Sequence, residues 1–354
     1  MAQLDGLRAF AVLAVVFYHY VAGHLAGYAA YPLAGYAAYS GVRLFFALSG
    51  FLITGILLRA RDDAELEGVK RIGALARFYA RRSLRIFPLY YVVVGLVYVV
   101  DFEPARALIG WLLTYTLNLF MAHQGWLENR FAHFWSLAVE EQFYLFWPWV
   151  ILFLRRRWLI PATLAMVSLA PLWRLSYALS GYTTMTSLAT GISTVSCLDH
   201  LGLGALLALI VHRHPERAGD LRRLTVLLLP LAVAGATAAR LLPSLPVFLA
   251  LHDPLQAVAF CCVIHGASRG YGGLAGRVLS WTPILYVGKI SYGVYVYHPF
   301  MPPLVAFILL RATGVALAEE ELVISAGAAA LTVAVAALSW HAMERPINAL
   351  KRYV

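Results

Sequence analysis

The stretch LDGLRAFAVLAVVFYHY at residues 4–20 indicates the fold most directly, because it opens a membrane-length apolar run yet contains Arg8 and His19. On a helix that turns by about 100° per residue, the eleven steps between them return to within about 20° and advance about 16 Å. Both side chains are therefore expected on one helix face. Ionisable groups at membrane depth usually face the bundle interior or a water-filled path, and mark function. The alternative is an interfacial arginine and a histidine satisfied within the core.

Composition places the chain among polytopic membrane proteins. Of its 354 residues, 61% are hydrophobic and 13% are charged, which is too apolar for an ordinary soluble domain. The formal net charge of +10 could indicate nucleic-acid binding, but the arginines lie mainly between apolar runs, as the positive-inside rule expects. We therefore expect a lipid bilayer as partner and no nucleic acid. Cys197, Cys261 and Cys262 lack metal-ligand spacing, so no metal site is expected.

Eleven apolar runs are candidates for membrane-spanning helices. They lie near residues 7–26, 41–58, 86–100, 107–122, 138–154, 158–179, 196–212, 221–241, 247–267, 284–311 and 322–343. The arginine-rich segment 59–85 should be cytoplasmic, and the later basic clusters join it there only if 107–122 does not cross. We predict an all-α polytopic transmembrane helix bundle, with about ten membrane-crossing helices plus one re-entrant or interfacial segment at 107–122. Both termini are then cytoplasmic, and the outer loops are 27–40, 101–137, 180–195, 242–246 and 312–321.

The whole chain, residues 1–354, is expected to form a single integral-membrane domain. No internal repeat, low-complexity tract or linker separates a second domain. No cleavable signal peptide is expected either, because cleavage after the first apolar run would remove Arg8 and His19.

Arg82 and Arg85 lie three residues apart at the start of a predicted span, so they are neighbours on one helix face. Two guanidiniums in this arrangement suit phosphate groups. Ordinary positive-inside anchoring is the alternative interpretation.

Glu140 and Glu141 occur together in WSLAVEEQFYLFWP, near the expected start of another span. Stabilisation by the helix dipole in the first turn, with Ser136 as a cap, accounts for one carboxylate. The second points about 100° away and needs another reason. It favours a functional role, either orienting His19 or binding a hydroxyl-rich acceptor.

A polar stripe interrupts the apolar run near the C-terminus. In VGKISYGVYVYHPF, residues 287–300, the side chains of Ser291, Tyr295 and His298 follow the i, i+4, i+7 spacing of one helix face. Hydrogen bonds between helices are the simpler explanation for this stripe alone. Farther along, Glu344 is expected at the membrane interface.

Five motifs, in order, resemble the membrane-bound acyltransferase 3 family of bacterial O-acetyltransferases. They are LDGLRAFAVLAVVFYHY (4–20), GVRLFFALSGFLIT (41–54), FYARRSLRIFPLYY (78–91), HFWSLAVEEQFYLFWP (133–148) and GKISYGVYVYHPF (288–300). The resemblance covers essentially the whole chain. It implies a bacterial inner-membrane enzyme that takes an acyl group, usually acetyl from acetyl-CoA on the cytoplasmic side, and passes it to a hydroxyl, often of an extracytoplasmic glycan. Two positions depart from the family pattern: Arg43 stands where Asp is common, and Cys197 where an Arg usually precedes Leu-Asp.

The resemblance also implies site residues. Acyl transfer to an alcohol needs a base for the hydroxyl proton and a positive field for the oxyanion, and an imidazole with an ordinary pKa of about 6.5 suits the first task. We predict His19 as general base, with direct transfer favoured over an acyl-histidine intermediate. The other predicted catalytic residues are Glu140 and Glu141, and the residues predicted to bind the donor are Arg8, Arg82, Arg85, Tyr292 and His298.

Two other function classes fit parts of this pattern. A proton-coupled transporter of a small solute would also place Arg, His and Glu within a bundle, but it usually shows inverted repeats or paired broken helices. A glycosyltransferase acting on a lipid-linked sugar would share the basic inner face, but it more often carries acidic clusters for metal and phosphate. The sequence shows neither feature.

Overall fold

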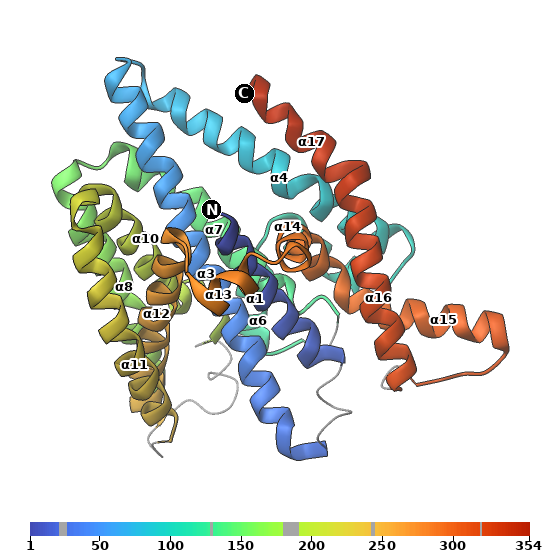
Figure 1. The fold of residues 1–354 in the computed structure, drawn as a ribbon. Coiled ribbons are helices and arrows are strands. Elements are labelled where there is room, and N and C mark those ends of the chain that lie inside the picture. Colours follow the sequence, from blue (N-terminus) through green and yellow to red (C-terminus); the bar gives the residue numbers. More distant parts are fainter. Residues whose placement is uncertain (21–26, 128–129, 180–190, 242–244, 319–320) are drawn as a thin grey trace. The chain divides into compact units, whose positions relative to one another are not determined.

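The computed structural model describes residues 1–20, 27–127, 130–179, 191–241, 245–318 and 321–354, and every regular element in these ranges is helical (Figure 1). The predicted all-α class is therefore confirmed. Hydrophobic composition without β-forming alternation explains this outcome, because within a bilayer a helix satisfies its own backbone hydrogen bonds.

Seven helical segments of the described chain are long and apolar enough to cross a membrane. They are Leu33–Leu66, Arg71–Val99, Arg156–Leu179, Val195–Arg213, Gly219–Leu241, Thr282–Thr313 and Leu322–Tyr353. The other three predicted crossings correspond to α1 (Ala2–Tyr20), α7 (Phe134–Phe153) and α12 (Leu245–Arg269), of 19, 20 and 25 residues. These lengths fall within the range of transmembrane helices. The total of ten crossings stays a prediction.

The run at 107–122 is not one continuous helix. It forms α5 (Ala105–Leu113) and α6 (Leu117–Gln124), with Tyr115 at φ 52° between them. At 1.5 Å per residue, helices of nine and eight residues cover less than half of a hydrocarbon core about 30 Å thick. Neither helix can cross alone, in agreement with the predicted re-entrant or interfacial segment.

The predicted outer loop at 27–40 is wrong. This segment is helical and forms the first part of α3 (Gly27–Leu66), a helix of 40 residues. Alanine, the residue with the highest intrinsic helix propensity, occurs five times between residues 27 and 40, and the sequence prediction gave its pattern too little weight. Most of the predicted loop at 180–195 lies outside the described residues.

The chain divides into two compact units, which we describe separately. The first comprises residues 1–42, 80–109 and 271–354, and the second comprises 43–79 and 110–270. Helices α3 and α4 (Arg71–Val99) each contribute to both. The single domain predicted for residues 1–354 stays a prediction.

In the first unit, α1 packs against α14 (Thr282–Tyr297), α13 (Gly273–Leu279) and α16 (Leu322–Ser339). The approach of α1 and α14 depends on Gly288, where an added Cβ would lie 1.9 Å from the backbone oxygen of Asp5. Such small residues let helix backbones approach closely in membranes. The unit also contains α15 (Met301–Thr313), a π-helical turn (Trp340–Glu344) and α17 (Arg345–Ala349).

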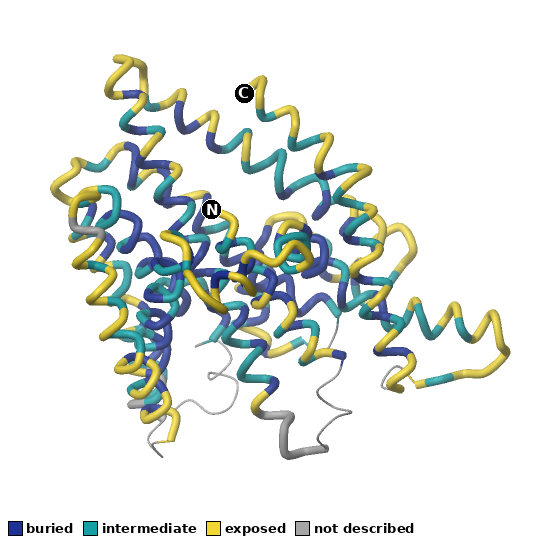
Figure 2. The backbone as a smooth tube through the Cα atoms, in the orientation of Figure 1, coloured by how far each residue is buried: buried dark blue, intermediate teal, exposed yellow. Residues whose placement is uncertain are grey.

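In the second unit, α10 (Leu198–Arg213) packs against α8 (Arg156–Leu179) and α12, and α11 (Ala218–Leu241) packs against α12. Gly204 brings α10 onto α3, because a Cβ there would lie 2.1 Å from the backbone oxygen of Ala47. Figure 2 shows long exposed stretches on α11, whose exposed side chains include Val226, Leu227 and Leu231. Exposed apolar side chains on a helix of this length suit contact with lipid.

Helices α3 and α7 run in the same direction and are joined at three levels of the second unit. Ser49 meets Glu140, Trp147 Nε1 donates to Thr54 Oγ1 at 2.7 Å, and the Arg61 guanidinium donates to the Leu154 carbonyl at 2.8 Å. Around Arg61, an ion-pair network joins the end of α3 to the starts of α4 and α8. Its members are Arg61, Asp62, Glu65, Arg71 and Arg156.

Candidate active site

His19 lies on the side of α1 that faces the protein. Exposed apolar residues form a stripe along α1 at Phe10 (43%), Leu13 (37%) and Phe17 (44%). Two residues along a helix turn by about 200°, so His19, two positions after Phe17, points away from this stripe. Val15, on the face of His19, is buried. His19 itself is exposed on this face, as a group that must reach a substrate has to be.

The contact of His19 with its own helix fixes its tautomer. Its Nδ1 lies 2.9 Å from the carbonyl oxygen of Val15. A carbonyl only accepts hydrogen bonds, so Nδ1 carries the hydrogen and, in the neutral ring, Nε2 carries the lone pair. The backbone thus supplies the partner that the sequence analysis assigned to a glutamate. His19 is left with Nε2 as a proton acceptor.

His298 lies beside His19, with ring centroids 5.0 Å apart. Its Nδ1 donates to the carbonyl oxygen of Tyr295 at 2.7 Å, and the residue is fully buried. The hydroxyl of Tyr20 donates to the carbonyl oxygen of His298 and lies 2.9 Å from Thr332 Oγ1. The polar stripe predicted on α14 thus brings a second imidazole to the general base. Its assignment to donor binding stays a prediction.

Arg8 is paired with Asp5, one turn earlier on α1. The guanidinium Nη1 lies 2.7 Å from Asp5 Oδ1, and both side chains are partly exposed. A partly exposed ion pair of this kind contributes little to stability, so the guanidinium can exchange partners at low free-energy cost. Asp5 was not among the predicted site residues, although it precedes Arg8 at helical spacing.

Arg82 and Arg85 are half-buried on α4, in the same unit as Arg8 and His19. The hydroxyl of Tyr292 donates to the carbonyl oxygen of Ile86 at 3.0 Å, which joins α14 to α4 directly after Arg85. Lys351 lies within electrostatic range of both arginines. The structure therefore adds a third cation to the predicted phosphate-binding pair.

Glu344 is buried, with 4% of its surface exposed, so the predicted interfacial position is wrong. It ends the π-helical turn, where Ser339 Oγ donates to its carboxylate at 3.0 Å. It also interacts electrostatically with Arg85. π-Helical turns re-aim side chains and occur frequently at functional sites. The sequence gives no periodic signal for this turn, because one extra residue disturbs the helical pattern only locally.

Glu140 and Glu141 lie in the second unit, near the middle of α7. The helix begins at Phe134, so neither carboxylate is in its first turn, and stabilisation by the helix dipole is wrong for both. Ser49 Oγ donates to Glu140 Oε1 at 2.5 Å and accepts a hydrogen bond from Tyr144 at 2.9 Å. The catalytic role of this pair beside His19 stays a prediction.

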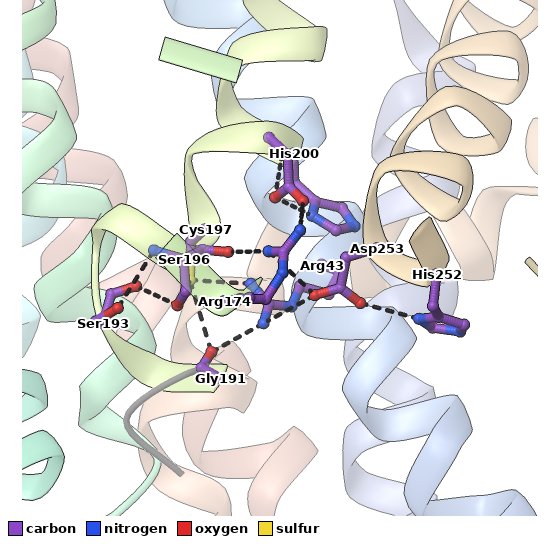
Figure 3. Close-up of polar contacts among 10 residues, drawn as sticks. Arg43, Arg174, Gly191, Ser193, Ser196, Cys197, His200, His252 and Asp253 are labelled. Atoms are coloured by element: carbon purple, nitrogen blue, oxygen red, sulfur yellow. Dashed lines mark hydrogen bonds and ion pairs between the residues drawn. The ribbon is translucent and has the colours of Figure 1, made fainter. Parts of the chain in front are cut away.

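A buried polar cluster in the second unit was not predicted as a site. Figure 3 shows Arg43 from α3 and Arg174 from α8 between the carboxylates of Asp199 and Asp253 and the turn before α10. Each of these four side chains is at most 8% exposed. The signal was present, because ionisable residues interrupted the apolar runs 158–179, 196–212 and 247–267.

The family match comes from the sequence as a whole. A sequence model of a family described as an acyltransferase domain matches residues 1–341. The chain belongs to this acyltransferase family. The predicted family resemblance is confirmed.

The curated relatives of this acyltransferase carry names from cell-wall acetylation. O-acetyltransferase OatA of Staphylococcus aureus is 30% identical over 86% of this chain and 50% of its own length. The putative peptidoglycan O-acetyltransferase YrhL of Bacillus subtilis is 26% identical over 98% and 54%, and peptidoglycan O-acetyltransferase OatA of Listeria monocytogenes 28% over 84% and 48%. The chain spans about half the length of these relatives. No solved structure matches it.

In this acyltransferase, the two positions that depart from the family pattern touch each other. Arg43 Nη1 donates to Cys197 Sγ at 2.9 Å, within the buried cluster. The two departures are therefore one structural change. Among the described residues, no group of three or more His, Cys, Asp or Glu side chains is placed to hold a metal ion.

Proposed function

We propose that this acyltransferase moves an acetyl group from acetyl-CoA, on the cytoplasmic side of the bacterial inner membrane, to a hydroxyl of an extracytoplasmic glycan. The observation that carries the proposal is the arrangement of His19, whose Nδ1 is held by the Val15 carbonyl while Nε2 is left to accept a proton. The family supports acyl transfer over transport, and the relatives' names support acetyl as the group and a peptidoglycan-like glycan as the acceptor class.

In the proposed reaction, Nε2 of His19 takes the proton of the acceptor hydroxyl as its oxygen attacks the thioester carbonyl. The tetrahedral intermediate collapses by breaking the carbon–sulfur bond. The CoA thiolate leaves and takes the proton from the imidazolium, so His19 returns to its neutral form. Direct transfer needs no covalent acyl-enzyme, and it accounts for the position of the imidazole on the protein-facing side of α1.

The cations of the first unit would bind the donor. Arg82 and Arg85 suit the phosphates of the nucleotide end, and Lys351 adds a third positive charge beside them. Arg8 is separated from His19 by about 16 Å along α1, a distance that an extended pantetheine arm can bridge. Tyr292 would fix α4 at the level of the arginines through its bond to Ile86. Because Val15 already holds the His19 tautomer, we assign Glu140 and Glu141 to the hydroxyls of the acceptor.

The decisive experiment replaces His19 by alanine in the purified full chain. His19→Ala should abolish transfer of labelled acetyl from acetyl-CoA to a soluble peptidoglycan disaccharide, a loss of at least about a hundredfold. His123→Ala, at the exposed end of α6, is the matched control and should retain full activity. Near-normal transfer by His19→Ala would contradict the assignment. Solute uptake into proteoliposomes without any acetyl transfer would favour the transporter instead.

A further inference from the structure

The buried cluster of the second unit holds one short turn from several directions. Arg43 Nη2 donates to the Gly191 carbonyl at 2.8 Å and its Nη1 donates to Cys197 Sγ, while Arg174 Nη1 donates to the Ser196 carbonyl at 2.5 Å. Two guanidiniums therefore grip residues 191–197, which we call the gripped turn (Figure 3). Such buried donors hold a backbone in one geometry, because their desolvation is compensated only while every bond is made.

The charges of the cluster balance, so it can persist at membrane depth. Asp253 Oδ2 lies 3.6 Å from Arg43 and 3.4 Å from Arg174, and Asp199 pairs with Arg174 at 2.5 Å. Each carboxylate also accepts from the Nδ1 of a neighbouring histidine, His200 or His252, at 2.9 Å. Two cations and two anions thus leave no net charge when both histidines are neutral.

The gripped turn is bonded in turn to the helix that carries the two glutamates. Thr194 Oγ1 donates to Gln142 Oε1 and accepts from Asn118 Nδ2 at 3.0 Å. Gln142 Nε2 donates to Asn118 Oδ1 at 2.9 Å and to the Tyr115 carbonyl at 2.8 Å. Gln142 follows Glu141 directly in the chain. A continuous polar path therefore leads from the guanidiniums to the glutamate pair.

The position of this path along the membrane normal points to the acceptor. Arg43 and Arg61 are 18 residues apart on α3, which is about 27 Å along the axis and close to the thickness of a hydrocarbon core. The network of Arg61, Arg71 and Arg156 is the basic end that the positive-inside rule places in the cytoplasm. Arg43 and the gripped turn are then at the opposite, outer side of the bilayer, where an extracytoplasmic glycan would arrive.

We propose that Arg43, Arg174 and Thr194 are positioning residues for the acceptor: they hold the gripped turn and the adjoining part of α7 in the geometry that binds the glycan hydroxyls. This inference rests on the proposed acetyl transfer. It predicts that the path sets the affinity for the acceptor and leaves donor binding unchanged, because the donor cations belong to the other unit and face the cytoplasm.

The test removes one hydroxyl from the path. Thr194→Val keeps the side-chain volume and loses both hydrogen bonds, so the KM for a soluble peptidoglycan disaccharide should rise roughly three- to tenfold, with the KM for acetyl-CoA unchanged. The matched control is Thr54→Val. Thr54 is a fully buried threonine between the same helices α3 and α7, and it accepts from Trp147 at a level nearer Arg61. Its loss should leave both KM values as they are.

Two further measurements separate positioning from a general structural defect. Thr194→Ser retains the hydroxyl and should restore the acceptor KM to within about twofold of the original. Arg43→Gln should raise the acceptor KM in the same direction. An equal fall in kcat with both KM values unchanged, or a rise in the KM for acetyl-CoA, would overturn the inference. Absence of acetyl transfer by the unaltered protein would instead contradict the proposed function, and is distinguished by that result alone.

Discussion

The two imidazoles of the first unit differ in their surroundings although each donates Nδ1–H to a backbone carbonyl. His19 bonds to the residue one turn earlier on α1 and is exposed, whereas His298 bonds to Tyr295 and is buried. Exposure decides which ring can meet a substrate. His298 therefore acts on the site through packing against His19, and its hydrogen bond keeps it in place.

His298→Asn should preserve the fold better than His298→Ala. The asparagine amide occupies the place of Nδ1 and can still donate to the Tyr295 carbonyl, whereas alanine removes this donor and leaves a cavity. We expect the alanine variant to lose about 1–3 kcal/mol more of unfolding free energy. Thermal unfolding in detergent measures the difference. Equal stabilities of the two variants would show that the bond does not matter.

At the scale of residues, the sequence identified the chemistry of the first unit and missed that of the second. Arg8 and His19 stood out because they share one helix face within a single apolar run. Arg43, Arg174, Asp199 and Asp253 come from four helices distant in sequence, and no single periodic pattern brings them together. Their pairing follows only from tertiary packing.

Among the helices, the contact of α1 with α14 places His19 and His298 together. The contact depends on Gly288, where the backbone of α1 leaves no room for a side chain. A change at this position acts on the site through the separation of the two helices, without touching a catalytic group.

Gly288→Ala should therefore reduce both stability and acetyl transfer. Its Cβ would overlap the Asp5 carbonyl, so the helices must separate, at a cost of about 1–3 kcal/mol. Gly95→Ala is the matched control, because no atom lies within 4 Å of its added Cβ in α4. The control should be neutral or slightly stabilising, since alanine favours helix more than glycine. A fully active and stable Gly288→Ala protein would refute the role of the close approach.

Elements were predicted more accurately where apolar periodicity was long than where it was short. The broken run at 107–122 was anticipated from charge placement, which depends on the whole chain. The helix over 27–40 was missed because small residues and tyrosines resemble a loop when no apolar stripe is present. Helix starts were also misplaced, as at α7, where Phe134 precedes the expected beginning.

For the whole molecule, topology follows from where the basic residues gather. The ion pairs of Arg156 with Asp62 and Glu65 place the start of α8 at the level where α3 ends. This shared level supports one cytoplasmic end for the second unit, as the sequence predicted.

Arg156→Cys should be inaccessible to a membrane-impermeant thiol reagent added to intact cells, and reactive once the membrane is permeabilised. Ala316→Cys, after the exposed end of α15 in the predicted outer segment 312–321, should be labelled from outside. The unaltered protein gives the background, because Cys197 and Cys262 are buried. Labelling of position 156 from the outer face would restore an eleventh crossing and reverse the assigned sides.

The π-helical turn at Trp340–Glu344 also has a consequence for comparing related chains. It accommodates one residue more than a regular turn, so a chain that lacks this surplus position would continue as an unbroken helix. Everything beyond it would then be rotated by about 100°, and Glu344 would no longer point at Gly293, whose added Cβ lies 3.5 Å from its carboxylate. Spacing, rather than residue identity, is therefore the character that evolution has to preserve along this last helix.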